Sequence, residues 1–173
     1  MRRVDSWEAL GPVRDRSLLV QEHLPGPEYS LDVLATESGE VRAVVPRERL
    51  RVDSGIAITS RTVHDDELEE IGARAAEAAG ISGVANVQVM RDAAGTPRLI
   101  EINPRFPGTM PLTVASGVNM PRLALGELLG EPIPLGPLEF SDVAMTRVFE
   151  DVPVDVDELE ALEAAVRTEA VAS

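Results

Sequence analysis

The sequence has no cysteine, no lysine and only two histidines, His23 and His64, in 173 residues. The lack of cysteine excludes disulfide bonds, thiolate metal sites and cysteine nucleophiles. The two histidines show no paired spacing, which argues against a histidine-rich zinc site, and we interpret both as surface or helix-capping residues. Because aromatic residues make up only 3% of the chain, its core must consist mainly of valine, leucine, isoleucine and alanine.

Long hydrophobic runs are absent too. No apolar stretch approaches the roughly 20 residues that a membrane-spanning helix needs. Two arginines stand near the N-terminus, but the apolar run of a secretory signal does not follow them. We therefore expect a cytoplasmic protein without membrane contact. The net charge of −14 argues against nucleic-acid binding, and residues 150–173 carry half of it.

Turn signals and apolar periodicity predict an α+β fold, with a mostly antiparallel sheet flanked by helices. We divide the chain into a helical lead-in at 1–16, one domain at 17–149 and an acidic helical tail at 150–173. The elements expected within the domain are strands at 17–22, 28–36, 41–45 and 55–63, a helix at 64–80, a hairpin at 83–103 with its turn at 92–97, a Pro/Gly loop at 104–111, a helix at 119–129 and a last strand near 139–149.

The run EINPRFPG carries the most informative polar pattern. Side chains alternate between the two faces of a strand, so Glu101, Asn103 and Arg105 are expected on one face. Ile100 and Ile102 are expected on the other face, in the core. The pattern therefore predicts a sheet with one apolar face and one face of charged and amide groups.

Gln88, in the run NVQVM, adds a further polar side chain to that face. If Arg91 pairs with Arg98 across the turn, Gln88 falls directly opposite Glu101, with Cβ atoms roughly 5 Å apart. A carboxylate, two amide oxygens and a guanidinium on one face suit a hard cation and a phosphate. The competing interpretation is a solvated sheet face whose strand ends at Pro104.

Four motifs occur in a characteristic order: VQEHLPGPEYSLDV (20–33), NVQ (86–88), EINPRFPG (101–108) and ASGVNMPRLALGELLG (115–130). In this order they resemble the C-terminal half of an ATP-grasp domain, most nearly the branch of the carbamoyl-phosphate synthase large subunit and related carboxylate–amine ligases. The resemblance covers residues 17–131. It implies ATP and Mg²⁺ (or Mn²⁺) as cofactors, and a small carboxylate substrate that is activated as an acyl phosphate before an amine or similar nucleophile attacks it.

The resemblance also implies roles for single residues on the polar face. Gln88, Glu101 and Asn103 match the magnesium ligands of the family. Arg105 matches a catalytic arginine that meets the substrate or the transferred phosphate. The competing interpretation of Arg105 is a structural salt bridge to Glu101.

The nucleotide base and ribose have matching positions near the start of the domain. The backbones of Glu22 and Leu24 correspond to those that bind adenine, and Glu28 corresponds to the acceptor for the ribose hydroxyls. The alternative for Glu28 is a surface residue beside a turn. Arg47 and Arg49 match the acyl-phosphate pocket more loosely, and a solvated strand edge is an equal alternative for them.

Complete family members also carry an N-terminal domain, a glycine-rich phosphate loop and usually one or two lysines on the phosphates. This chain has none of these. We therefore expect half of an ATP site, which an N-terminal portion, for instance a separate N-terminal ATP-grasp chain, would have to complete for ligase activity. The alternatives are a non-catalytic relic or regulatory module of the same fold, and an unrelated metal-binding β domain.

Overall fold

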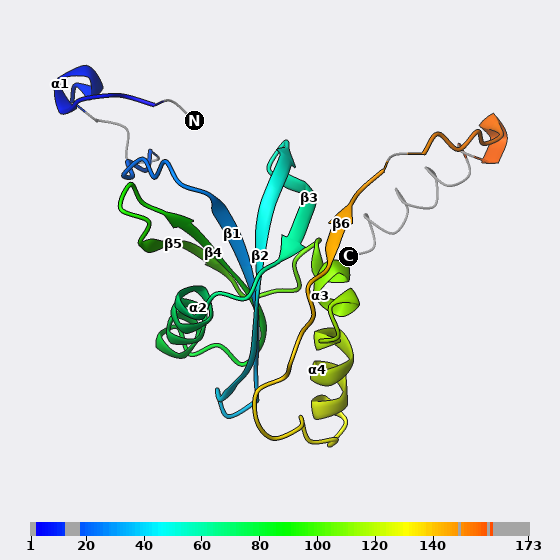
Figure 1. The fold of residues 1–173 in the computed structure, drawn as a ribbon. Helices are drawn as coiled ribbons and strands as arrows, with labels where there is room; N and C mark the ends of the chain where they lie inside the picture. Colours follow the sequence, from blue (N-terminus) through cyan, green and yellow to red (C-terminus); the bar gives the residue numbers. More distant parts are fainter. Residues whose placement is uncertain (1–2, 13–17, 149, 159, 161–173) are drawn as a thin grey trace.

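A computed structural model describes residues 3–12, 18–148, 150–158 and 160. Its centre is a six-stranded sheet of order β5-β4-β1-β2-β3-β6, in which every neighbouring pair is antiparallel (Figure 1). The predicted α+β class is thus confirmed. The strands are β1 (Glu28–Ala35), β2 (Val41–Asp53), β3 (Ile56–Thr62), β4 (Gly83–Arg91), β5 (Pro97–Asn103) and β6 (Ala144–Thr146), and the helices are α1 (Trp7–Leu10), α2 (Asp66–Ala78), α3 (Met110–Ala115) and α4 (Met120–Leu128).

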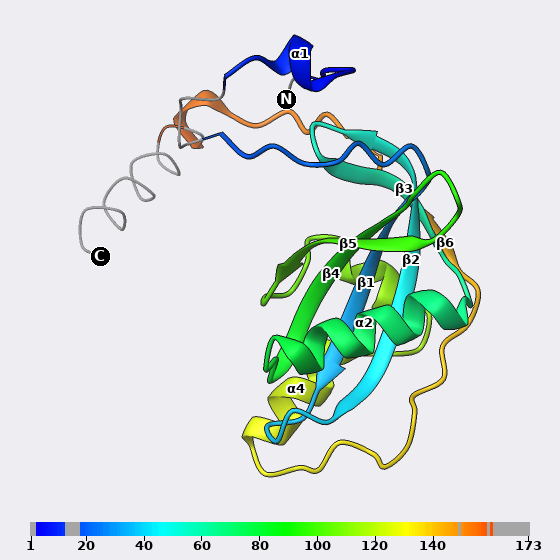
Figure 2. The ribbon, with the colours of Figure 1, turned by 90° about the vertical axis from the view of Figure 1, so that its left-hand side faces the viewer.

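Helices cover both faces of the sheet. Figure 2 shows α2 in front of the sheet and α4 behind it. On the α2 side, Leu31 of β1 and Leu68 of α2 belong to one buried apolar cluster. On the opposite side, Leu34 of β1 shares a second cluster with Met110 and Met120 of α3 and α4. Strand β1 is therefore buried on both faces, and its polar residues Ser30 and Asp32 lie inside the protein.

Helix α2 begins and packs as its sequence predicts. The side chain of Asp65 accepts a hydrogen bond from the backbone N–H of Leu68 at 3.2 Å, which caps the helix. Acidic residues in the first turn also interact favourably with the positive end of the helix dipole. At Gly72 the helix approaches the sheet closely, because a Cβ there would lie 2.7 Å from Cγ1 of Val44 and 3.2 Å from Cδ1 of Leu31.

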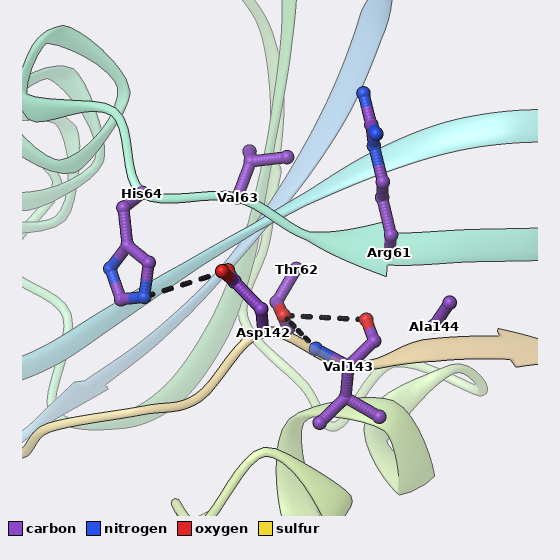
Figure 3. Close-up of a pocket in the computed structure, with 7 residues that line it drawn as sticks. All are labelled: Arg61, Thr62, Val63, His64, Asp142, Val143 and Ala144. Carbon is purple, nitrogen blue, oxygen red and sulfur yellow. Dashed lines mark hydrogen bonds and ion pairs between the residues drawn. The ribbon is translucent and has the colours of Figure 1, made fainter.

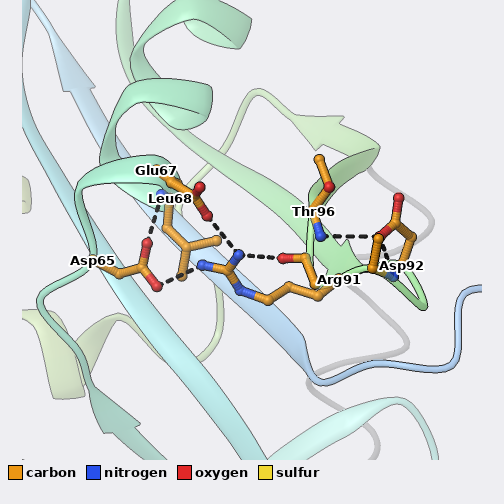
Figure 4. Close-up of polar contacts among 8 residues, drawn as sticks. Asp65, Glu67, Leu68, Arg91, Asp92 and Thr96 are labelled. Carbon is orange, nitrogen blue, oxygen red and sulfur yellow. Dashed lines mark hydrogen bonds and ion pairs between the residues drawn. The ribbon is translucent and has the colours of Figure 1, made fainter.

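Arg91 ties the β4–β5 hairpin to the start of α2 (Figure 4). Its guanidinium donates to Asp65 at 2.6 Å and to Glu67 at 2.7 Å, and it also reaches the carbonyl of Gly95 in the hairpin turn. The hydrogen bond to Glu67 is the largest cause that raises the pKa of Arg91 above its ordinary value. One side chain thus fixes the hairpin relative to the helix.

The hairpin turn is organised by Asp92. Its carboxylate accepts the backbone N–H groups of Ala94 and Thr96, both at 2.9 Å, and Arg98 of β5 donates to its other oxygen. The bond from Thr96 is the main cause that lowers the pKa of Asp92, which burial opposes and Arg98 supports. The DAAGTP segment is therefore a turn, as predicted.

The strand predicted at 17–22 is wrong for its described part. Residues 18–22 form no strand, and Leu18, Leu19 and Val20 are 63%, 79% and 44% exposed. The physical reason is the lack of a pairing partner: β1 is flanked by β4 and β2, and no described strand lies beside residues 18–22. An apolar run alone does not make a strand when its backbone groups have nothing to pair with.

Three other boundaries differ from the prediction. The strand predicted at 139–149 shrinks to β6, because the backbone of Ser141 donates to the carbonyl of Ser116 and not to a strand. The predicted loop 104–111 gives way to α3 at Met110, where a proline in the first turn suits a helix start. The 41–45 strand extends to Asp53.

The acidic tail falls mostly outside the described residues. Residues 156–158 and 160 are helical, in keeping with the predicted tail helix, and residues 161–173 lie beyond the described part. No described helix combines the length and the apolar character that crossing a membrane requires.

Replacing Gly72 with alanine tests how closely α2 packs on the sheet. Alanine favours a helix over glycine by about 1 kcal/mol, but overpacking against Val44 and Leu31 costs about 1–3 kcal/mol. We expect a net loss of about 1 kcal/mol in the free energy of unfolding, measured by urea denaturation. Glu77→Ala, on the exposed side of the same helix, serves as the control and should cause almost no change. A stabilised Gly72→Ala protein would contradict the close packing.

Candidate functional site

One row of polar residues crosses five strands on the face opposite α2. The strand register sets Glu101 opposite Gln88, Gln88 opposite Ser30, Ser30 opposite Arg47, and Arg47 opposite Thr62. Residues directly opposite one another in an antiparallel sheet point to the same face. The row therefore runs from exposed Glu101 at the sheet edge to buried Arg47 on β2 and Thr62 on β3.

The predicted pairing of Gln88 with Glu101 is present, but the assumed turn register is wrong. Arg91 pairs with Pro97 and not with Arg98. The register then shifts by one residue between Val89 and Gln88, where a β-bulge takes up the extra residue of β5. Because of this bulge, Gln88 pairs with Glu101, although the register set at the turn would not have paired them.

Asn103 lies beside this pair. Its Nδ2 donates to Oε1 of Glu101 at 2.8 Å, and its Cα partner across the ladder is Asn86. Gln88, Glu101 and Asn103 thus bring one carboxylate and two amide groups together on one face. Within the described part of the chain, three or more carboxylate or histidine side chains nowhere gather as a metal site would require. A cation here would depend on amide oxygens and on oxygens from its own ligand.

Arg105 does not continue the alternation of β5. The strand ends at Asn103, and the backbone N–H of Arg105 turns back to the carbonyl of Asn103 at 2.8 Å. Arg105 is exposed in the loop at 104–109. Among the described residues it forms no salt bridge to Glu101, since Glu101 accepts from Asn103 instead.

The segment expected to hold adenine runs into β1 beside the end of β4. Glu22 is exposed and Leu24 is half-buried, and both lie outside any strand. The turn that follows is anchored, because Gly26 donates to the carbonyl of Arg91 at 3.0 Å and Arg91 donates to the carbonyl of Pro27 at 3.1 Å. A side chain at Gly26 would collide with that carbonyl of Arg91. The anchor thus fixes where this segment enters the sheet.

Glu28 lies on the same face as Gln88, two residues further along the strands. It pairs with Met90, so it lies about 7 Å along the ladder from Gln88. Its Oε1 accepts from Arg49 of β2, which also donates to the carbonyl of Gly55 at 2.7 Å. Arg49 is therefore neither a solvated edge residue nor a free cation, and Glu28 retains one carboxylate oxygen without a described partner.

Sequence reasoning missed the buried network beneath the row. Arg47 and Asp32 are both 0% exposed and form an ion pair at 2.5 Å. Arg47 also donates to Thr109 at 2.5 Å, while Asp32 accepts from Asn86 at 2.9 Å and from Thr113 at 2.5 Å. The available signal was a charged residue, Asp32, between the apolar residues Leu31 and Val33 in the middle of β1. The alternative of a solvated strand edge is wrong for Arg47, because its side chain is buried and bonded to Thr109 at the start of α3.

A separate open hollow of about 570 Å³ lies where β6 joins β3, lined by residues from Arg61 to His64 and from Asp142 to Ala144 (Figure 3). His64 Nε2 lies 3.7 Å from Oδ1 of Asp142, and its ring stacks on Phe140 at 4.1 Å between centroids. Figure 3 shows Arg61 extending away from this pair. Arg61 therefore does not join His64 and Asp142 around one point, and the hollow does not resemble a binding site for a particular ligand.

Comparison with known proteins places the fold and the polar face in a family. Residues 14–151 match the family described as "ATP-grasp in the biosynthetic pathway with Ter operon". The chain therefore belongs to the ATP-grasp superfamily, as its motifs led us to expect. The match includes β1 to β6, the polar row and the loop that carries Arg105.

Two curated relatives are D-alanine–D-alanine ligases. The protein of Ectopseudomonas mendocina (strain ymp) is 29% identical over 154 residues, which cover 74% of this chain and 48% of the relative. That of Stutzerimonas stutzeri (strain A1501) is 28% identical over 145 residues, which cover 72% and 44%. The chain thus spans about half the length of the curated relatives it matches.

Solved structures agree on the fold. N5-carboxyaminoimidazole synthetase from Staphylococcus aureus superposes with a TM-score of 0.58 at 15% identity, covering 69% of this chain and 34% of that one. A biotin carboxylase complex from Campylobacter jejuni gives 0.57 at 17% identity, covering 66% and 28%. At these identities the likeness shows the fold alone.

Removing the charge of Asp32 tests the buried network. Asp32→Asn leaves the guanidinium of Arg47 buried without a counter-charge, so we expect a loss of about 3–5 kcal/mol in the free energy of unfolding. Glu70→Gln breaks the exposed pair with Arg74 on α2 and should cost under about 0.5 kcal/mol. Equal effects of the two substitutions in urea denaturation would show that Arg47 reaches solvent.

Proposed function

We propose that this chain is the ATP- and magnesium-binding part of an ATP-grasp ligase that activates a carboxylate as an acyl phosphate. The observation that carries the proposal is the cross-strand pair of Gln88 and Glu101 with Asn103 beside it, on one polar sheet face. Membership in the ATP-grasp superfamily supports it. Because the chain spans about half the length of its curated relatives, the activity of the whole protein is part of the proposal.

The donor set of the polar face suits a nucleotide-bound magnesium ion. Mg²⁺ prefers oxygen ligands and keeps waters and substrate phosphates among them, so one carboxylate and one or two amide oxygens are sufficient protein ligands. Asn103 donates to Glu101 through Nδ2, and its Oδ1 remains available as an acceptor. Bound Mg²⁺ or Mn²⁺ would neutralise charge on the phosphates during transfer.

The nucleotide itself would extend from the polar face toward the entry of β1. In this proposal, the backbones of Glu22 and Leu24 bind the base, and the free oxygen of Glu28 accepts a ribose hydroxyl. The anchored turn at Gly26 supports this assignment, because it holds the segment beside the end of β4. The bond from Arg49 would hold the carboxylate of Glu28 in its orientation.

The reaction needs positioning and charge neutralisation more than covalent work by the protein. An oxygen of the substrate carboxylate attacks the γ-phosphorus of ATP, and the bond to the leaving ADP breaks. An amine then attacks the acyl carbon, and inorganic phosphate leaves. In this scheme Arg105 stabilises the charge of the transferred phosphoryl group. The names of the two curated relatives support an amine-bearing nucleophile.

We further propose that an N-terminal ATP-grasp portion, carrying a glycine-rich loop and lysine side chains, closes the other side of the nucleotide cleft in the cytoplasm. Sequencing the DNA immediately upstream of the codon for Met1 tests this directly. The proposal expects a frame that encodes such a loop and lysine, either continuous with this chain or as a neighbouring gene.

Substitution of Glu101 by glutamine tests the metal assignment. We expect Mg²⁺ to raise the affinity of the wild-type chain for ADP by roughly tenfold, and Glu101→Gln to abolish this gain, measured by isothermal titration with and without Mg²⁺. The free energy of unfolding should change by under about 0.5 kcal/mol, since Glu101 is exposed. Glu48→Gln, on the opposite face of the sheet, is the control. A folded Glu101→Gln variant that keeps the Mg²⁺-dependent gain in affinity for ADP would contradict the assignment.

Turnover separates a ligase from a binding module of the same fold. Together with its N-terminal portion, the ligase forms ADP and phosphate only when a carboxylate and an amine are both supplied. The proposed ligase function fails if the reconstituted protein binds the nucleotide in a Glu101-dependent manner but forms no ADP with any pair in a panel of amino and hydroxy acids.

A further inference from the structure

The strongest unexplained feature is that α3 is tied to the sheet through a buried charge. Arg47 of β2 donates to Asp32 of β1 at 2.5 Å and to Oγ1 of Thr109 at 2.5 Å. One turn later in α3, Thr113 donates to the other oxygen of Asp32 at 2.5 Å. The helix is thus held at two points by a single ion pair that is inaccessible to solvent.

Thr109 is used in an unusual way. It occupies the N-cap position of α3, where a threonine hydroxyl normally accepts a backbone N–H of the first turn. Its hydroxyl makes no such bond and accepts from Arg47 instead. The start of α3 therefore depends on a side chain that lies 62 residues earlier in the chain.

The loop at 104–109 is consequently fixed at both ends. At its start, Asn103 is held by the ladder to Asn86 and by its bond to Glu101. At its end, Thr109 is held by Arg47. This loop carries Arg105 two residues after the proposed metal ligand Asn103.

Stability alone is a poor reason for such a network. A buried ion pair often contributes no more than apolar residues of the same volume would, because burying both charges is costly. Here the cost is increased, since Nε of Arg47 is buried without any described partner. The network instead fixes the relative orientation of its side chains, because each hydrogen bond requires a defined geometry.

We infer that Arg47 is a positioning residue: through Thr109 it holds the loop at 104–109 and thereby places Arg105 for the phosphate. This inference rests on the proposed function for the role of Arg105, whereas the placement of the loop can be tested without it. Thr109→Val removes the acceptor of Arg47 and leaves the shape of the side chain nearly unchanged. Thr113→Val is the matched control, because it removes one hydroxyl from the same network at the far end of α3.

Amide hydrogen exchange tests the placement. The backbone N–H groups of Arg105 and Met110 are bonded within the loop, to Asn103 and Pro107. In Thr109→Val we expect both amides to exchange roughly tenfold faster, because the loop loses its anchor. In Thr113→Val they should stay as in the wild type, and Thr109→Ser, which retains the hydroxyl, should restore protection. If the two valine variants expose these amides equally, Arg47 only stabilises the fold and the inference is wrong.

Nucleotide affinity tests the consequence for Arg105. If Thr109 places Arg105 for the transferred phosphate, Thr109→Val should lower the preference for MgATP over MgADP. The loss should be as large as the loss caused by Arg105→Ala. Combining the two substitutions should lower it no further. Additive losses would contradict the coupling of Thr109 to Arg105. If the wild type shows no Mg²⁺-dependent nucleotide binding, the proposed function fails, while the exchange comparison still decides whether Arg47 places the loop.

Discussion

The ion pair between Arg47 and Asp32 is the interaction on which the rest of the structure depends. Both charges are fully buried, so each must find its partners within the protein or incur the cost of desolvation. Their partners come from β4 and from two positions one turn apart in α3, its N-cap included, through Asn86, Thr109 and Thr113. The ion pair and its partners therefore fix the central strands, α3 and the loop at 104–109 in one arrangement. The polar row of the sheet is built on the same strands.

The sheet face opposite α2 is divided along its length. At one end, Leu34 and Val45 lie under α3 and α4 in an apolar cluster. Toward the other end the same face carries Glu28, Gln88 and Glu101, and the side chains become more exposed. This face is therefore buried where the helices pack and more exposed where the charged groups lie. The more exposed end is where the proposed nucleotide and metal ion would lie.

Much of this site could be predicted from local sequence, and the remainder depends on contacts between distant residues. Strand alternation was sufficient to put Glu101 and Asn103 on one face, but the pairing of Gln88 with Glu101 depends on a bulge that no turn signal reveals. The apolar run at 18–22 resembles a strand in sequence, yet a strand also needs a neighbour, and periodicity does not report one. Nothing in the local sequence shows that Asp32 is buried, and only the packing of α3 on the sheet reveals it.

The central claim is that Gln88, Glu101 and Asn103 hold a divalent cation with a nucleotide. Paramagnetic broadening by Mn²⁺ in the presence of ADP tests it most directly, because the side-chain NH₂ signals of glutamine and asparagine report the distance to the ion. The account predicts that the NH₂ signals of Gln88 and Asn103 broaden first, while those of Gln21 and Asn119 remain sharp. Equal broadening of all four signals, or broadening of Asn119 before Gln88, would contradict it.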